Sequence, residues 1–211
     1  MKVVVVGASD LTEGVVRELT ERGHQVVVFD DVKDPVERLE AELDITGAVV
    51  DLLNFDELER YGFSKADILI LAHRDDSVNT ILGMYAKIVN IPRVVAVLRS
   101  RRMAEVVTRL GLASRAVVIG EVVGEEVRSS IHGAKLIELP GGRVLAALDV
   151  EKLGRVVGTS VKDFRNTWDA VVVGIVDKEG LFKEPLDEYT FREGDVVIVL
   201  AERRRIEDML L

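Results

Sequence analysis

The stretch MKVVVVGASDLTEGVVRELTERGHQVVVFD, residues 1–30, decides the fold of this chain. An apolar run at 2–6 breaks at Gly7, a helical pattern follows, and a second apolar run at 26–29 stops at Asp30. A strand–turn–helix–strand unit that ends in an acidic residue is typical of dinucleotide-binding folds. In those folds the turn holds the pyrophosphate and the carboxylate holds the ribose. The opening stretch therefore predicts a fold of this type.

The expected phosphate turn departs from the fingerprint G-x-G-x-x-G, which needs three glycines. The chain has Gly7, but Ser9 and Thr12 stand where the second and third glycines belong. Ser9 or Asp10 can cap the following helix, and Asp10 with Glu13 has the spacing of a capping box. We hypothesise that this helix caps itself and that dinucleotide binding is weak or lost. The alternative is a tolerant site in which the Ser9 hydroxyl binds phosphate.

Two acids follow the second apolar run. Asp30 stands where a carboxylate would accept the ribose hydroxyls, and Asp31 comes next. Two carboxylates would repel a 2′-phosphate, so NADP is disfavoured. The alternative is that both are ordinary loop acids.

Composition excludes several classes of function. The chain has 211 residues, a formal net charge of −9 and no cysteine. Nonspecific nucleic-acid binding depends on neutralising phosphates, so we expect no nucleic-acid partner. Disulfides, thiolate metal sites and cysteine nucleophiles are ruled out. No apolar stretch approaches the ~20 residues that cross a bilayer.

Apolar, β-branched runs alternate with helical patterns through the first 120 residues. The runs lie at 3–6, 26–29, 48–50, 68–71, 94–98 and 116–119, and the helical segments at 11–22, 36–43, 56–61, 76–89 and 101–110. Strands that are apolar throughout indicate a parallel sheet covered on both faces. We predict an α/β fold, a Rossmann-like doubly wound parallel sheet of six strands.

The pattern changes after about residue 120. One more helix is expected at 121–131, strands at 143–150, 170–176 and 195–200, and short helices at 160–164 and 205–211. Closely spaced strands with few long helices predict a small C-terminal α+β domain. We therefore expect one domain at 1–132, including a crossover helix at about 121–131, and a second at 133–211.

Further segments carry an ordered set of motifs. They read RGHQVVVFD at 22–30, VVDLLN at 49–54, KADILILAHRDDSVN at 65–79, IPRVVAVLRS at 91–100, GRVVGTSVKDF at 154–164, AVVVGIV at 170–176 and FREGDVVIV at 191–199. Their order resembles the cytosolic RCK (regulator of K⁺ conductance) subunits of Trk/Ktr-type potassium uptake systems and of ligand-gated potassium channels. The resemblance covers essentially the whole chain.

The resemblance implies a regulatory, gating subunit of a potassium uptake system or channel, and no enzyme. Its partner would be a potassium-translocating membrane protein, which would hold it at the inner face of the cell membrane, on the cytoplasmic side. Such subunits pair as homodimers that swap the crossover helix and can assemble into larger rings. Their ligands are nucleotides, here NAD(H) or ATP/ADP, or other small molecules.

The family's nucleotide positions fall on particular residues of this chain. They are Gly7, Ala8 and Ser9 on the phosphate turn, Asp30 with the adjacent Asp31 at the ribose, Asp51 and Leu52 near the adenine, His73, Arg74, Asp75 and Asn79 near the phosphates, and Arg99 facing the ligand. The adenine segment departs from the family's G-D-A-T, because Val50 replaces its glycine and Leu53 its threonine. Arg74 and Arg99 would still offer positive charge to ATP or ADP.

Two other functions stay open. One is an NAD-dependent oxidoreductase, against which stand the altered turn and the lack of a paired Tyr and Lys at helical spacing. The other is a structural dimerisation module whose C-terminal domain alone binds a ligand such as a cyclic dinucleotide. The three histidines are scattered, so we expect no metal site.

Overall fold

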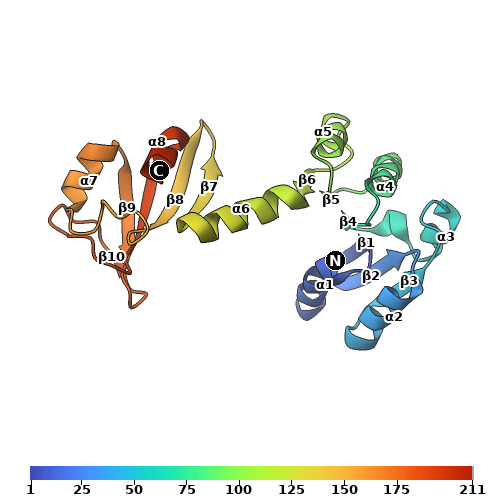
Figure 1. The fold of residues 1–211 in the computed structure, drawn as a ribbon. Coiled ribbons are helices and arrows are strands. Elements are labelled where there is room, and N and C mark those ends of the chain that lie inside the picture. Colours follow the sequence, from blue (N-terminus) through green and yellow to red (C-terminus); the bar gives the residue numbers. More distant parts are fainter. Residues whose placement is uncertain (211) are drawn as a thin grey trace. The chain divides into compact units, whose positions relative to one another are not determined.

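The computed structural model describes residues 1–210, apart from the side chain of His132. The chain divides into two compact units, Met1–Val122 and Val123–Leu211. Both units are drawn in Figure 1, and each is described here by itself.

The first unit is built on a six-stranded sheet in the order β3-β2-β1-β4-β5-β6. Its strands are β1 (Lys2–Val6), β2 (Gln25–Asp30), β3 (Thr46–Val49), β4 (Ile68–Leu71), β5 (Val94–Leu98) and β6 (Arg115–Val118). The connections contain α1 (Asp10–Glu21), α2 (Lys33–Glu42), α3 (Phe55–Arg60), the 3₁₀ helix η1 (Phe63–Lys65), α4 (Asp76–Ile88) and α5 (Arg101–Arg109). Every neighbouring pair of strands is parallel. The predicted Rossmann-like, doubly wound sheet of six strands is confirmed.

Helices cover both faces of this sheet. The valines of Val3–Val6 are fully buried, and alternate ones belong to two different cores. One core includes Leu82 of α4 and Val107 of α5, and the other includes Val16 of α1 and Leu39 of α2. With both faces closed, the carboxyl ends of β1 and β4 are the natural place for a ligand, because the strand order reverses there.

The second unit contains a five-stranded antiparallel sheet in the order β10-β9-β11-β8-β7. Its elements are β7 (Ala134–Leu139), β8 (Arg143–Asp149), α7 (Val161–Trp168), β9 (Val171–Val176), β10 (Phe182–Lys183), β11 (Val196–Glu202) and α8 (Arg203–Met209). Its core gathers apolar side chains from the strands and from α7 and α8. The predicted small α+β domain is confirmed.

Two strands of this unit do not stand out in the sequence. Strand β7 forms an edge of the sheet and most of its side chains are exposed, so it lacks an apolar run. Strand β10 forms the other edge and has only two residues. Natural edge strands are often short or carry charged side chains, which discourages pairing with other chains.

Helix α6 (Ile119–His132) begins in the first unit and ends in the second. It exposes Val122, Val123, Val127 and Ile131, each by more than half of its surface. None of the helices in the described part of the chain is long and apolar enough to cross a bilayer.

Candidate functional site

A cavity of about 200 Å³ lies at the carboxyl edge of the first sheet. Its lining consists of Gly7, Ala8, Ser9, Asp30, Val32, Pro35, Ala72, Arg74 and Arg99. Six of these residues are among the predicted site residues, and they come from four segments far apart in the sequence. Val32, Pro35 and Ala72 were missed. Ala72 directly follows β4, Val32 lies two residues after β2, and Pro35 lies in the first turn of α2. The end of a predicted strand is a signal that could have found Ala72.

The turn after β1 depends on Gly7. Its φ of +109° is strained for any residue with a side chain. A Cβ there would lie 2.6 Å from the carbonyl oxygen of Ala72 at the end of β4. The backbone of this turn therefore packs directly against the segment that follows β4, and Gly7 allows the tight turn, which is the role of the first glycine in the fingerprint.

Ser9 and Thr12 close the turn from within. Ser9 is the N-cap of α1, and its backbone N–H donates to the hydroxyl of Thr12 over 3.0 Å. The same hydroxyl donates to the carbonyl oxygen of Gly7 over 2.8 Å, and Thr12 is only 3% exposed. Thr12 thus supports the turn, where the fingerprint has a glycine.

The proposed capping box of Asp10 and Glu13 is wrong. The Asp10 Oδ1 atom lies 2.6 Å from Nη2 of Arg38, and the Glu13 Oε1 atom lies 3.1 Å from Nη2 of Arg17. Both acids are therefore drawn to cations on the helix surface instead of the helix end. The backbone N–H groups of Asp10 and Leu11, which open α1, have no acceptor among the described residues.

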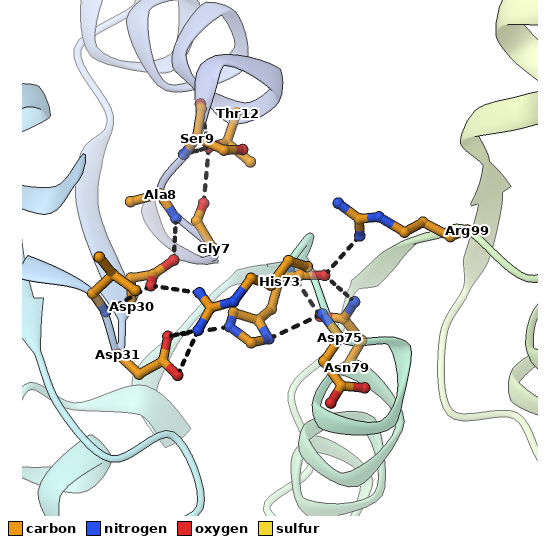
Figure 2. Close-up of polar contacts among 12 residues, drawn as sticks. Gly7, Ala8, Ser9, Thr12, Asp30, Asp31, His73, Asp75, Asn79 and Arg99 are labelled. Atoms are coloured by element: carbon orange, nitrogen blue, oxygen red, sulfur yellow. Dashed lines mark hydrogen bonds and ion pairs between the residues drawn. The ribbon is translucent and has the colours of Figure 1, made fainter. Parts of the chain in front are cut away.

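Asp30 is buried and already satisfied. Its Oδ2 accepts the backbone N–H of Ala8 over 2.7 Å, and its Oδ1 accepts that of Val32 over 2.9 Å. The Arg74 guanidinium lies 3.4 Å from Oδ1. With 3% of its surface exposed, Asp30 ties the phosphate turn to the loop after β2 (Figure 2). The predicted ribose carboxylate is at the expected place, but backbone donors occupy it.

Asp31 is the exposed acid of the pair, and two cationic or polar groups converge on it. Arg74 Nη2 lies 2.8 Å from its carboxylate and His73 Nε2 lies 3.3 Å away. His73 Nδ1 accepts the backbone N–H of Asp75, so the ring proton is on Nε2 and is donated to Asp31. Desolvation acts to raise the pKa of Asp31, but interactions with Asp30, Arg74 and His73 outweigh it and hold that pKa below its usual range.

The same cluster has the outline of a metal site. One ligand atom from each of Asp30, Asp31 and His73 lies within 4.8 Å of the others. The Arg74 guanidinium, however, already lies against both carboxylates. Its fixed positive charge takes the place that a cation would need.

Two polar side chains, the buried Asn79 and the exposed Asp75, hold the loop after β4 in place. Asn79 is 1% exposed and bonds both the N–H and the C=O of His73, over 2.9 and 2.8 Å (Figure 2). Asp75 caps α4 by accepting the N–H of Ser77 over 2.8 Å, and this bond lowers the pKa of Asp75. Arg99 Nη1 donates to the carbonyl oxygen of His73 over 3.3 Å. Asn79 and Asp75 are therefore positioning residues, whereas Arg99 reaches into the pocket lining.

The predicted adenine residues are not among those that line the pocket. Leu52 is 3% exposed and belongs to the core beneath the sheet. Asp51 is exposed and its carboxylate accepts the N–H of Leu53 over 2.9 Å. Asp76, which was not among the predicted site residues, accepts the N–H groups of Arg99 and Ser100 and so fixes the loop after β5.

Comparison with known proteins matches both halves of the chain. The family model of the TrkA-N domain matches residues 3–119, and that of the TrkA-C domain matches residues 145–210. The Trk system potassium uptake protein TrkA homolog of Archaeoglobus fulgidus is 22% identical over 217 residues, covering 98% of this chain and 48% of that protein. TrkA of Mycobacterium tuberculosis is 33% identical over 97 residues, covering 46% of this chain and 44% of that protein. The chain thus spans less than half the length of the curated relatives it matches.

Solved structures share the fold. The GsuK channel bound to NAD matches with a TM-score of 0.71 at 18% identity, covering 100% of this chain and 39% of that one. The GsuK structure bound to ADP matches with a TM-score of 0.54 at 20% identity, covering 62% of this chain and 35% of that one. The two family models match in this order over a chain with this fold. The chain therefore belongs to the family of RCK-type Trk regulatory proteins that join a TrkA-N domain to a TrkA-C domain.

Proposed function

We propose that this chain is a regulatory subunit that binds an adenine nucleotide at the carboxyl edge of its first sheet and thereby gates a potassium-translocating membrane protein. Family membership supports the regulatory part, and the relatives named above are potassium uptake proteins. Of the GsuK structures that share the fold, one is bound to NAD and one to ADP. The observation that carries the nucleotide part is the cavity at the switch point, which two arginines line.

The charges and donors of the cavity suit a phosphorylated ligand. Arg74 and Arg99 both reach the lining, and guanidinium groups bind phosphate oxygens in a bidentate manner. The free N–H groups of Asp10 and Leu11 add the positive end of α1. The N–H groups of Ala8 and Ser9 are engaged by Asp30 and Thr12, so the arginines carry more of the phosphate binding than in a complete fingerprint. NAD(H), ATP and ADP are the ligands to test.

Gating would act through a shift between conformations of an assembly, without any chemical step. The exposed apolar side chains of α6, Val122, Val123, Val127 and Ile131, support pairing of two copies through this helix. In this proposal α6 is the crossover helix between a nucleotide domain and a C-terminal ligand domain. The assembly is a homodimer or a ring that lies on the cytoplasmic face of the membrane, held there by its partner.

One other function draws on a specific observation. The internal bonds to Ala8 and Ser9 favour a first domain that serves as a structural dimerisation module. The C-terminal domain would then bind the ligand, for which a cyclic dinucleotide is the candidate.

The remaining alternative is an NAD-dependent oxidoreductase. Such an enzyme would turn over NADH, which a hydride-transfer assay with small carbonyl substrates would detect.

The deciding experiment is a thermal-shift titration of the full chain with NAD⁺, NADH, ATP, ADP and cyclic di-AMP. A ligand present at 100 times its Kd stabilises the folded state by about 2.7 kcal/mol. We expect a shift with an adenine nucleotide that is reduced in Arg99→Gln. Arg101→Gln is the matched control, because Arg101 is an exposed arginine whose partners are Glu105 and Glu121. A shift with cyclic di-AMP alone would move the ligand site to the C-terminal domain.

A further inference from the structure

Arg74 is held by acids of its own chain at the point where a phosphate would have to recruit it. Its Nη1 lies 3.4 Å from Asp30 and its Nη2 lies 2.8 Å from Asp31. Asp30 is buried, and backbone donors fix it from two sides. Asp31 and Arg74 are different, because 42% and 54% of their side-chain surfaces are exposed. The Arg74–Asp31 pair is therefore the part of the network that can open.

We propose that the ion pair between Arg74 and Asp31 is an autoinhibitory latch of the nucleotide site, which the phosphate of the ligand opens by taking the Arg74 guanidinium. This inference rests on the proposed nucleotide function. It defines the ligand class as a phosphorylated nucleotide, because an uncharged nucleoside has no group that replaces the Asp31 carboxylate. It also gives Asp31 a role opposite to that of a ligand-binding residue.

The size of the cavity supports a closed state. Pockets that enclose drug-sized ligands measure about 300–1,000 Å³. The cavity here measures about 200 Å³ with Arg74 in its wall. Movement of an exposed arginine enlarges the cavity without disturbing the core, whereas movement of Asp30 would release the turn at Ala8.

Other contacts keep Asp31 in place when Arg74 leaves. His73 is 3% exposed and donates from Nε2 to the Asp31 carboxylate. Asn79 in turn fixes the backbone of His73. The acid therefore stays at the rim as the competitor of the phosphate, and the Arg74 guanidinium is the group that changes partner.

The expected effect is modest because the pair is exposed. Exposed ion pairs are weak, so removing the latch should tighten nucleotide binding by about 1.5- to 5-fold. A charge-assisted bond from Arg74 to phosphate is stronger than an exposed pair, so loss of Arg74 should weaken binding by about tenfold or more. The two changes differ in sign, which makes them separable.

The test is a double-mutant cycle on the full chain, with ADP as the probe in isothermal titration calorimetry. Asp31→Asn should tighten ADP binding and Arg74→Gln should weaken it. In the Arg74→Gln background, Asp31→Asn should not increase the affinity for ADP, because Asp31 then has no guanidinium with which to pair. A gain that persists without Arg74 would mean that Asp31 merely repels an anion, and weaker binding in Asp31→Asn would make it a ligand-binding residue. Either result overturns the latch.

Asp34→Asn is the matched charge control, since Asp34 is an exposed acid next to Pro35 in the pocket lining. It should change ADP affinity less than Asp31→Asn does, and an equal gain in affinity would refute the latch.

If the wild-type chain binds ADP and the cycle is additive, the latch is refuted while the nucleotide function stands. If ADP binds to Asp31→Asn but not to the wild type, the latch is supported when Arg74→Gln abolishes that binding and refuted when it does not. If neither binds ADP, ATP or NAD⁺, both proposals are refuted.

Discussion

Replacing Asp30 by alanine should destabilise the first unit even when no ligand is present. The substitution removes the acceptor of the Ala8 N–H, which lies 2.7 Å from Oδ2 in a residue that is 6% exposed. The other two donors to Asp30, the Val32 N–H and the Arg74 guanidinium, belong to exposed residues, so water can replace the lost acceptor. Loss of one charge-assisted bond and the orphaning of one buried N–H add up to about 2–4 kcal/mol. A carboxylate that only awaited ribose hydroxyls would contribute almost nothing to stability.

Urea unfolding of the full chain measures this loss. Trp168 lies in the second unit, so its fluorescence follows that unit, while far-UV circular dichroism also follows the first. The dichroism transition that does not coincide with the Trp168 transition is that of the first unit. We expect Asp30→Ala to lower the urea midpoint of this transition. Asp30→Asn, which keeps one acceptor oxygen, should lose less. A loss below about 0.5 kcal/mol, the range of ordinary surface substitutions, would refute the reasoning.

Three further outcomes follow from the same turn and its surroundings. Thr12→Val keeps the shape but orphans the Ser9 N–H and the Gly7 C=O, so it should cost about 1–3 kcal/mol in urea unfolding; an unchanged midpoint would show that neither bond matters. Gly7→Ala places a Cβ 2.6 Å from the Ala72 carbonyl oxygen at a positive φ, and we expect more than about 3 kcal/mol of lost stability or failure to fold; a wild-type melting curve would contradict this. The lowered pKa of Asp31 means that the folded state binds this proton less readily than the unfolded state, so its contribution is present above the unfolded pKa and is lost as pH falls through the folded one. Because Asp31 is exposed, Asp31→Asn should reduce the acid-induced loss of stability by less than about 1 kcal/mol, measured as melting temperature against pH; a greater loss in the variant would give the wrong sign.

The sheet could be predicted from the sequence because its strands are apolar on both faces. The run Val3–Val6 is buried whichever way each side chain points, so no register had to be known. The breaks at Gly7 and Asp30 then locate the carboxyl edge. Strands β7 and β10 could not be found in this way, because edge strands bury few side chains and carry no comparable signal.

The sequence indicates some of the residues at the carboxyl edge but none of their bonds. Asp30 and Arg74 were expected at this edge, and both line the cavity there. Their contacts span large sequence separations, since Ala8 precedes Asp30 by 22 residues and Asp31 precedes Arg74 by 43. Spacing along the chain indicates which residue types meet at an edge, but it does not tell whether a carboxylate faces a ligand or a backbone N–H. Leu52 illustrates the same limit, because its place in the core follows from packing alone.

The departure from the glycine fingerprint and the hydrogen bonds that the turn receives from its own chain have one physical cause. A turn whose donors point at an absent phosphate would leave buried N–H groups without partners, which is costly. Here the hydroxyl of Thr12 accepts the N–H of Ser9, and the carboxylate of Asp30 accepts the N–H of Ala8, so these two donors have partners without a ligand. In the proposed function a nucleotide would bind through groups that are free or that can change partner, and Arg74 could change partner without disturbing a buried bond. Such a site would favour a ligand that exchanges over one that is permanently bound, which is what a sensor of nucleotide concentration requires.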